Sequence, residues 1–201
     1  MKGNVWDFYA PVYNLLMSGN KKAYRNMCER IRVVIQNKRV LELACGTGLI
    51  SKAVADVSRS YIATDFSEQM LAQALRGKRP EQLMFSKADA ANLPFGANSF
   101  DVVIISNALH IIPEPERVLS ECRRVLGKNG VLIAPNFIHG EVSRWQMLWT
   151  QALIRAGIAF EASWDEKEYA KFLSHNGWKV RRSEILKGSL PLMYTECVRR
   201  K

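Results

Sequence analysis

The sequence lacks the features that mark exported and membrane-spanning proteins. Its longest apolar runs, such as Val102 to Ile105 and Val131 to Ala134, are far shorter than the roughly 20 residues that cross a bilayer. The start, Met1 to Asn4, does not lead into a signal-peptide core. We therefore expect a soluble, cytoplasmic protein without a transmembrane segment.

Cysteine is scarce and scattered, and no internal repeat or low-complexity tract is present. No C-x-x-C pair occurs, and no histidine lies near a cysteine at ligand spacing, so neither a zinc site nor a disulfide framework is indicated. We expect packed structural thiols and no metal. The four residues concerned are Cys28, Cys45, Cys122 and Cys197.

Acidic residues are outnumbered, which gives a formal net charge of +10 and a pI of about 9.6. Such a charge permits binding to nucleic acid. The basic residues nevertheless come in small groups, such as Lys21-Lys22 and Arg181-Arg182, without one long stripe. This dispersal favours an ordinary solvated surface, so nucleic acid is a possible partner but not the favoured one. The oligomeric state is left open.

Strand and helix patterns alternate through the middle of the chain. With 201 residues and 48% hydrophobic content, the chain suits one domain with a sizeable core. Apolar strands alternating with helices predict a doubly wound α/β fold, in which helices cover both faces of a parallel sheet. The predicted strands are 39–43, 60–64, 83–87, 101–105 and 131–134, and the predicted helices are 49–57, 67–76 and 115–126.

Several element boundaries have a local cause. Ser67 is a helix N-cap with acidic Glu68 behind it, Gly77 is a helix stop, and 127–130 is a glycine-containing tight loop. Near the end, a short helix opens at 165–168 and closes near Gly177. The runs 178–186 and 190–198 then predict an antiparallel hairpin at the sheet edge.

Two regions are less regular. Residues 4–30 are rich in aromatic side chains and predict two short helices on either side of the turn at 18–20, forming either a cap on the fold or a plainly packed arm. Residues 138–165 predict an amphipathic helical insertion. The alternatives for it are a lid, an ordinary packed helix, a dimer contact or a membrane-surface helix.

The stretch from Val40 to Ile50 predicts a strand, a tight loop and a helix. Gly46 and Gly48 remove side chains where the backbone must bend and where a ligand approaches closely. The following helix would offer unpaired N–H groups. A nucleotide-like or carboxylate-bearing ligand would fit there.

Asp65 follows the second predicted strand, and its carboxylate can accept two hydrogen bonds from a ribose diol. Helix capping is the alternative role. A nicotinamide-binding protein would show a third small position in G-x-G-x-x-G. Counting from Gly46 that position is Ser51, and counting from Ala44 it is Leu49, which weakens the dehydrogenase hypothesis.

Five segments in order closely resemble the class I S-adenosylmethionine-dependent methyltransferases, and within them the small-molecule branch that includes the ubiquinone- and menaquinone-biosynthesis methyltransferases. The resemblance is strong over residues 38–135. The segments are Val40 to Gly48, Asp65 to Met70, Ala88 to Ala90 with Leu93 to Phe95, Phe100 to Val103, and Leu126 to Leu132.

The resemblance implies a seven-stranded Rossmann-like sheet with the last strand inserted antiparallel. It implies S-adenosylmethionine as the cofactor and S-adenosylhomocysteine as the product. The methionine part would lie against Glu42, Ala44, Gly46, Gly48 and Asn107, the ribose on Asp65, the adenine near Phe66, Met70, Asp89 and Ala90, and Tyr13 would close over the cofactor.

Two departures from the family pattern matter. Ala44 stands where the family usually has glycine. The segment from Asn107 to His110 replaces the Asn/Asp-Pro-Pro-Tyr/Phe sequence of the nucleic-acid amine methyltransferases, which argues against amine chemistry on bases.

The expected reaction is an in-line methyl transfer to a small, apolar or aromatic O, S, N or C acceptor. For an acceptor that must lose a proton, His110 and His139 are the candidate bases, because they lie near the ends of the fourth and fifth strands. An RNA methyltransferase and a non-catalytic cofactor-binding regulator are the alternatives.

The expected layout is a single methyltransferase domain over 1–201. Its parts are an N-terminal helical cap (1–30), the cofactor-binding core (31–137), the helical lid insertion (138–165), and the final helix with the edge hairpin (166–201).

Overall fold

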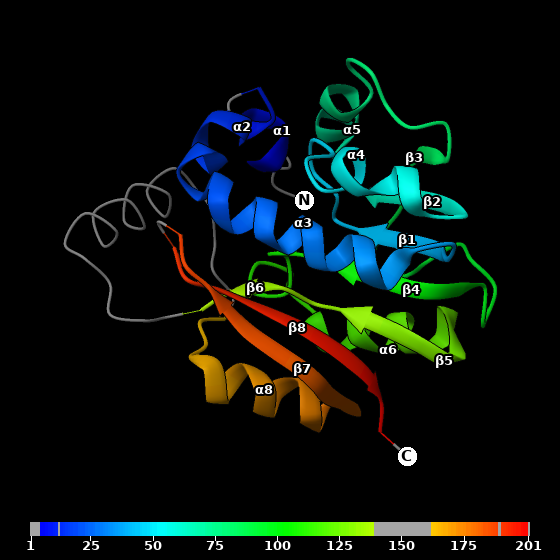
Figure 1. Cartoon of the computed structure of the whole chain (residues 1–201), viewed down its shortest axis with the longest axis vertical. Coiled ribbons are helices and arrows are strands. Elements are labelled where there is room, and N and C mark those ends of the chain that lie inside the picture. The colour runs from blue at the N-terminus through cyan, green and yellow to red at the C-terminus, as the bar shows by residue number, and fades with distance from the viewer. Residues whose placement is uncertain (1–4, 12, 139–161, 189, 201) are drawn as a thin grey trace.

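A mixed β-sheet forms the centre of the computed structural model, which describes residues 5–11, 13–138, 162–188 and 190–200. Figure 1 shows the sheet, whose eight strands among these residues have the order β3-β2-β1-β4-β5-β8-β6, with β7 paired to β8. The strands are β1 (Arg39–Leu43), β2 (Ser60–Asp65), β3 (Leu83–Lys87), β4 (Phe100–Ile105), β5 (Leu126–Ile133), β6 (Asn136–Phe137), β7 (Trp178–Leu186) and β8 (Leu192–Arg199).

The strand directions confirm the predicted topology. Strands β1 to β5 pair in parallel, whereas β8 runs antiparallel to β5, β6 and β7. The last strand is therefore inserted between β5 and β7, and the edge hairpin is formed as expected. The two-residue β6 is the strand that the sequence pattern did not predict.

Seven α-helices lie within the described residues, together with two 3-10 turns. They are α1 (Val5–Tyr9), α2 (Tyr13–Leu16), α3 (Lys21–Ile35), α4 (Ser51–Val54), α5 (Glu68–Ala74), α6 (Pro115–Val125) and α8 (Glu166–His175), with η1 (Met17–Asn20) and η2 (Ala55–Val57).

Three local predictions differ from the structure. The N-terminal region has three helices where two were expected, because α3 buries Ala23, Met27 and Ile31 at four-residue spacing and continues to Ile35. The helix expected over 49–57 is reduced to α4 followed by η2. The loop expected at 127–130 belongs to β5, as an irregularity between two pairs of strand partners.

Helices cover both faces of the sheet, as Figure 1 shows. On one face α3, α4 and α5 pack over a core that includes Ile31, Tyr61 and Ile104. On the other face α6 and α8 pack around a core that includes Leu43, Leu119 and Leu173. The central strands β1 and β4 are buried on both faces, which explains their nearly continuous apolar sequences, whereas the edge strand β3 is largely exposed.

The helix caps follow the sequence signals. The Ser67 hydroxyl accepts a hydrogen bond from the backbone N–H of Met70 at 3.1 Å, which caps α5. Asp165 and Glu168 form a reciprocal capping box at the start of α8. Gly77 has a φ of +77° and lies just beyond α5, at the predicted stop.

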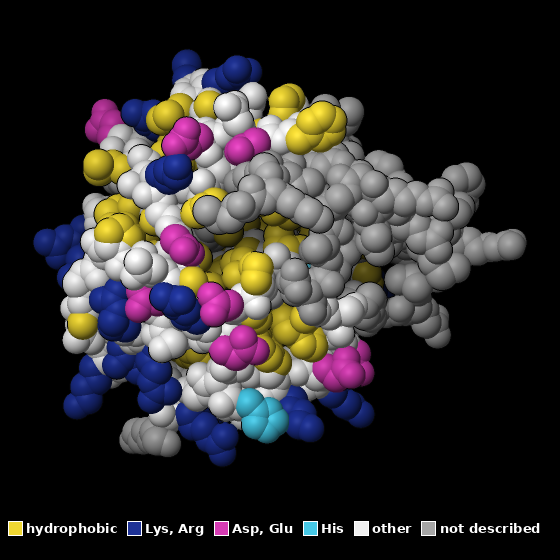
Figure 2. Space-filling view, turned by 180° about the vertical axis from the view of Figure 1, so that it is seen from behind, with side chains coloured by type: hydrophobic (Ala, Val, Ile, Leu, Met, Phe, Trp, Pro, Cys, Tyr) yellow, Lys and Arg dark blue, Asp and Glu magenta, His cyan; other side chains and the backbone are white. Residues whose placement is uncertain are grey.

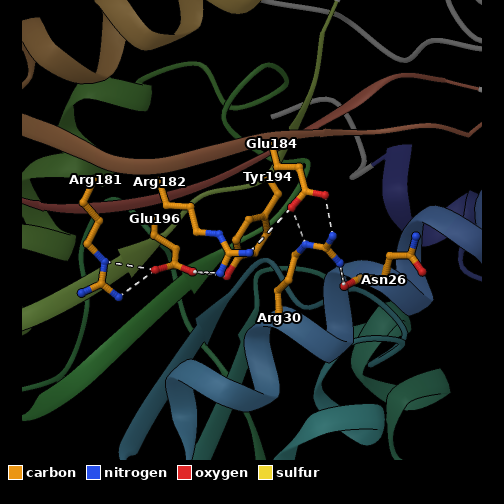
Figure 3. A network of polar contacts seen from close by, with 7 residues as sticks. All are labelled: Asn26, Arg30, Arg181, Arg182, Glu184, Tyr194 and Glu196. Carbon is orange, nitrogen blue, oxygen red and sulfur yellow. Dashed lines mark hydrogen bonds and ion pairs between the residues drawn. The ribbon is translucent and has the colours of Figure 1, made fainter.

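A polar network fastens α3 to the hairpin (Figure 3). Arg30 on α3 donates from Nε to Oε2 of Glu184 on β7 at 2.7 Å. Glu196 on β8 is 4% exposed and accepts from Arg181 Nε at 3.0 Å and from the Tyr194 hydroxyl at 3.0 Å. These bonds satisfy the buried carboxylate and join the first long helix to the last two strands.

The insertion predicted over 138–165 lies mostly outside the described residues, and so does His139. None of the helices that the structure does describe has the length and apolar character needed to cross a membrane. On the face shown in Figure 2, Lys and Arg side chains lie mostly along the margin, with Asp and Glu among them.

Candidate active site

The loops at the carboxyl ends of β1, β2 and β4 are tied together by backbone hydrogen bonds. Cys45 N donates to Thr64 O at 2.9 Å, which joins the loop after β1 to the end of β2. Asn107 N donates to Pro135 O at 2.9 Å, which joins the loop after β4 to the segment after β5. The sheet therefore presents one continuous edge of loops, where ligands bind in open α/β sheets.

The loop after β1 has three residues in the left-handed backbone region. The φ angles are +51° at Ala44, +57° at Gly46 and +76° at Gly48. Glycine adopts this region without strain, whereas alanine does so at a cost of about 1–2 kcal/mol. A methyl group at Gly48 would also lie 2.9 Å from Cζ of Phe85. The two glycines are thus required by backbone geometry, and Ala44 is strained.

The helix after this loop does not provide the expected anion site. It begins at Ser51 and ends at Val54, so it is a single turn. A ligand would therefore meet mainly the backbone of 44–48.

Asp65 connects the first two loops. Its Oδ2 accepts from Gly46 N at 2.7 Å, and its Oδ1 accepts from Ser67 N at 2.8 Å. Burial raises the pKa of the Asp65 carboxyl above its usual value, while these backbone donors oppose that effect. A carboxylate offers about four acceptor positions, so capping these N–H groups leaves room to accept from a diol.

Tyr13 and Met70 flank the glycine loop. A methyl group at Gly46 would lie 3.8 Å from Cε1 of Tyr13 and 4.0 Å from Sδ of Met70. Phe66 is 53% exposed, whereas Met70 is 2% exposed. One aromatic ring and one thioether therefore lie beside Gly46, and the Phe66 ring is open to a stacking partner.

The loop after β3 contains the predicted adenine contacts. Asp89 is exposed, Ala90 is half-buried, and Asp89 Oδ1 accepts from Ala91 N at 2.8 Å. Ala88 N donates to Asp65 O at 3.2 Å, which places this loop beside Asp65.

A line of hydrogen bonds runs from Asn107 to the N-terminal helices. Asn107 Nδ2 donates to the Tyr24 hydroxyl at 3.0 Å, and this hydroxyl is also hydrogen-bonded to the Tyr13 hydroxyl. Burial raises the pKa of Tyr13 to about 12, so the phenol stays protonated at neutral pH. Asn107 Oδ1 is buried without a hydrogen-bond partner among the described residues. A buried carbonyl oxygen of this kind needs a donor, which a ligand can supply.

Two further contacts attach the N-terminal helices to the loops. Thr47 Oγ1 donates to Asn14 Oδ1 at 2.6 Å, and the Ser67 hydroxyl donates to the Asp7 carboxylate. The sequence indicated a cap in this region through its aromatic content. Tyr24 is part of that aromatic content but was not singled out as a site residue, and the sequence gave no signal for Asn14 or Asp7, which are typical surface residue types.

Glu42 lies beneath the glycine loop. It is 2% exposed, and its Oε2 accepts from the Tyr61 hydroxyl at 2.9 Å. Burial raises the pKa of Glu42 to about 7. Its carboxylate is therefore paired with a β2 side chain and supports the loop from within the sheet.

His110 is also buried, at 8% exposed. Its Nδ1 lies 2.9 Å from Oδ1 of Asn136, and its ring meets that of Phe137 edge to face with centroids 6.3 Å apart. His139, the other candidate base, is outside the described residues. Asn136 is a residue that the sequence analysis missed, because a lone asparagine after a strand carries no signal. The described residues contain no group of three or more His, Cys, Asp or Glu side chains that could hold a metal ion.

A doubly wound sheet with an antiparallel last strand, a glycine loop after β1 and an acidic residue at the end of β2 defines the class of Rossmann-like methyltransferase folds. A model of the family described as "Methyltransferase domain" matches residues 41–134. The chain is 34% identical over 196 residues to a demethylmenaquinone methyltransferase of Paenarthrobacter aurescens, covering 87% of this chain and 77% of the relative. It is 31% identical to the Renibacterium salmoninarum enzyme of the same description, covering 94% and 89%.

Solved structures show the same fold at low identity. The complex of the Haloferax volcanii Trm112 methyltransferase activator with a putative methyltransferase matches with a TM-score of 0.80 at 18% identity, covering 98% of both chains. The DhpI–SAH complex matches with a TM-score of 0.76 at 19% identity, covering 97% and 93%. The [4+2]-cyclase SpnF matches at 0.73, so this fold alone does not decide the reaction.

The sequence similarity and the fold together identify the family and its reaction. The chain belongs to the class I S-adenosylmethionine-dependent methyltransferases and, within them, resembles the menaquinone-biosynthesis enzymes. It is an enzyme whose cofactor is S-adenosylmethionine. Two features of the site fit this cofactor: Asn107 Oδ1 is buried without a partner among the described residues and could accept from an ammonium group, and Gly46 leaves the loop backbone without a side chain between Tyr13 and Met70.

Proposed function

We propose that this enzyme methylates a small aromatic acceptor of the demethylmenaquinone type. The observation that carries the proposal is 34% identity over 77% of a demethylmenaquinone methyltransferase. The departure from the Asn/Asp-Pro-Pro-Tyr/Phe pattern at 107–110 agrees with an acceptor other than a nucleobase amine.

The chemistry of such an acceptor sets what the site must do. A quinone ring is electron-poor, so the reduced, hydroxyl-bearing form is the one that attacks an electrophilic methyl group. S-adenosylmethionine supplies that methyl group and leaves as S-adenosylhomocysteine. The protein has to align the ring carbon in line with the donor, exclude water and accept the hydroxyl proton. We assign proton removal to His110 or His139.

We propose the following roles for the cofactor residues. Asp65 holds the ribose hydroxyls, and Asn107 Oδ1 accepts from the ammonium of the methionine part, with Tyr24 and Tyr13 fixing the Asn107 amide. The backbone of the glycine loop, supported by Glu42, receives the methionine carboxylate side. Phe66, Met70, Asp89 and Ala90 surround the adenine.

The test supplies the purified chain with S-adenosylmethionine and chemically reduced demethylmenaquinone, and measures S-adenosylhomocysteine release and the methylated ring by mass spectrometry. We expect turnover with the reduced acceptor and none with the oxidised one. Folded protein that binds the cofactor but does not methylate this acceptor would contradict the acceptor assignment.

The same assay separates the alternatives. Methylation of total RNA, lost as salt rises, would identify an RNA methyltransferase. Cofactor binding without transfer to a panel of phenols, thiols, amines and RNA would point to a regulator. Loss of turnover on adding excess S-adenosylhomocysteine is the control for cofactor-dependent transfer.

A further inference from the structure

Asn136 and His110 come from two loops at the carboxyl edge of the sheet. His110 lies three residues after Asn107 in the loop that follows β4, and Asn136 begins β6 directly after Pro135. The backbone bond from Asn107 N to Pro135 O joins the two segments that carry His110 and Asn136.

Asn136 is rigidly placed. It is fully buried, and β6 pairs it with Met193 of β8. Its Nδ2 donates to the carbonyl oxygen of Phe137 at 2.9 Å. Because a carbonyl oxygen can only accept, this bond fixes which end of the amide is the nitrogen.

The amide orientation in turn fixes the histidine. With Nδ2 committed to Phe137, the atom 2.9 Å from His110 Nδ1 is the Oδ1 acceptor. Nδ1 must therefore carry a proton. In the neutral ring only one nitrogen is protonated, so Nε2 is the basic nitrogen.

We propose that Asn136 is a positioning residue that holds neutral His110 in the Nδ1–H tautomer and thereby makes Nε2 the atom that accepts the acceptor's hydroxyl proton. This inference rests on the proposed function for its chemical step. The O–H bond of the reduced acceptor breaks and its proton moves to Nε2, while a ring carbon bonds to the methyl carbon and the S–CH3 bond of the donor breaks. The methylated ring carbon then loses its hydrogen as a proton and the oxygen is reprotonated, which restores the aromatic quinol and releases one proton overall. The resulting imidazolium keeps its hydrogen bond to Asn136 and returns the proton to solvent.

The first experiment needs no acceptor. Two-bond 1H–15N correlation spectra of the ¹⁵N-histidine-labelled protein show which ring nitrogen is protonated, and His110→Gln and His175→Gln variants assign the signals. We expect the Nδ1–H tautomer at His110 in the wild type and in Asn136→Asp, which retains an acceptor oxygen. We expect its loss in Asn136→Leu. An Nε2–H tautomer in the wild type would overturn the proposal.

The second experiment measures turnover of reduced demethylmenaquinone. His110→Gln should lower kcat by about 100-fold or more, since general base catalysis contributes roughly 10²–10⁴-fold. Asn136→Leu should lower kcat about 10-fold or more with little change in acceptor KM, because much of the ring then presents the wrong nitrogen. Asn136→Asp should restore most of kcat. Unchanged kcat in Asn136→Leu, or in His110→Gln, would overturn the proposal.

The matched control is Asn176→Leu. Asn176 also donates from Nδ2 to a phenylalanine carbonyl, that of Phe172 at 2.9 Å, but it lies at the end of α8. The Asn176→Leu change should lower the melting temperature without changing the His110 tautomer or kcat. Thermal melts and S-adenosylhomocysteine binding check that each variant is folded. A wild type that binds cofactor but does not methylate the quinol contradicts the proposed acceptor, and the tautomer spectra then decide the Asn136 inference by themselves.

Discussion

The Asp65 carboxylate accepts a hydrogen bond from the backbone N–H of Gly46, with 2.7 Å between Oδ2 and N. The same carboxylate accepts from Ser67 N at 2.8 Å. One side chain therefore connects the loop after β1 to the loop after β2. It is also the side chain that we assign to the ribose. Its removal should affect both the loop and the ligand.

Asp65→Ala should raise the Kd for S-adenosylhomocysteine about 10- to 100-fold, because hydrogen bonds to a charged group contribute about 1.5–3 kcal/mol. Asp65→Asn keeps the shape of the side chain, and its Kd should lie between those of the wild type and Asp65→Ala. Isothermal titration calorimetry measures both. Asp56→Ala is the control, since Asp56 pairs with Arg32 on the surface of η2 and should leave the Kd unchanged. Equal affinity of Asp65→Ala and wild type would remove the ribose assignment.

The Ala44→Gly variant should have a higher free energy of unfolding than an ordinary alanine-to-glycine variant. Ala44 has a φ of +51°, so glycine relieves about 1–2 kcal/mol of strain, and the added flexibility of the unfolded chain cancels about 0.4–1 kcal/mol of it. Ala72→Gly, on the exposed face of α5, should cost about 1 kcal/mol. Urea unfolding gives both values. If Ala44→Gly is destabilised as much as Ala72→Gly, the strain at Ala44 is absent in solution.

Tyr24→Phe should weaken cofactor binding about 3- to 10-fold, which corresponds to roughly 1 kcal/mol for one neutral hydrogen bond. The change leaves Asn107 Nδ2 without its acceptor and frees the amide to turn. Tyr194→Phe removes a buried hydroxyl that donates to Glu196, far along the chain from the loops, and should lower the melting temperature only. If calorimetry with S-adenosylhomocysteine gives the same Kd for the two variants, the role proposed for Asn107 is contradicted.

Glu42→Gln should change the pH dependence of stability. Burial raises the pKa of Glu42 from its usual 4.5 to about 7 in the folded state. The folded protein therefore binds the Glu42 proton more tightly than the unfolded chain does, which contributes to the free energy of unfolding. This contribution is fully present below pH 4.5 and is lost as the pH rises to about 7. The free energy of unfolding lost in this way is about 3 kcal/mol.

Glutamine has no proton to lose, so the variant should gain stability relative to wild type at pH 8 compared with pH 5. Melting temperatures at the two pH values test this. A difference between variant and wild type that is the same at both values would show that Glu42 has an ordinary pKa.

Much of the fold follows from local sequence. Strands β1, β3 and β7 match the predicted ranges to the residue, because turn residues bound each of these strand-forming runs. Ser67 and Gly77 act at the ends of α5 as predicted. The errors concern elements whose length depends on packing: α4 ends after one turn, and α3 extends because its apolar side reaches the sheet.

The site divides in the same way. Gly46, Gly48 and Asp65 are recognisable in the sequence because backbone geometry and a fixed spacing require those residue types. The roles of the cofactor residues and of His110 stay predictions until the variants are measured, as does the division of the chain at residues 30, 137 and 165.

The sequence by itself determined the order of strands and helices, the glycine loop with its acidic partner and the family, since each depends on residues close together in the chain. Only the tertiary structure decided that Tyr24 and Asn107 share a hydrogen bond, that Asn107 Oδ1 is buried without a partner among the described residues, and that Asn136 Oδ1 lies 2.9 Å from His110 Nδ1. These contacts join residues 26 to 83 positions apart, and no local pattern encodes such pairs, because they arise only when the sheet brings its loops to one edge.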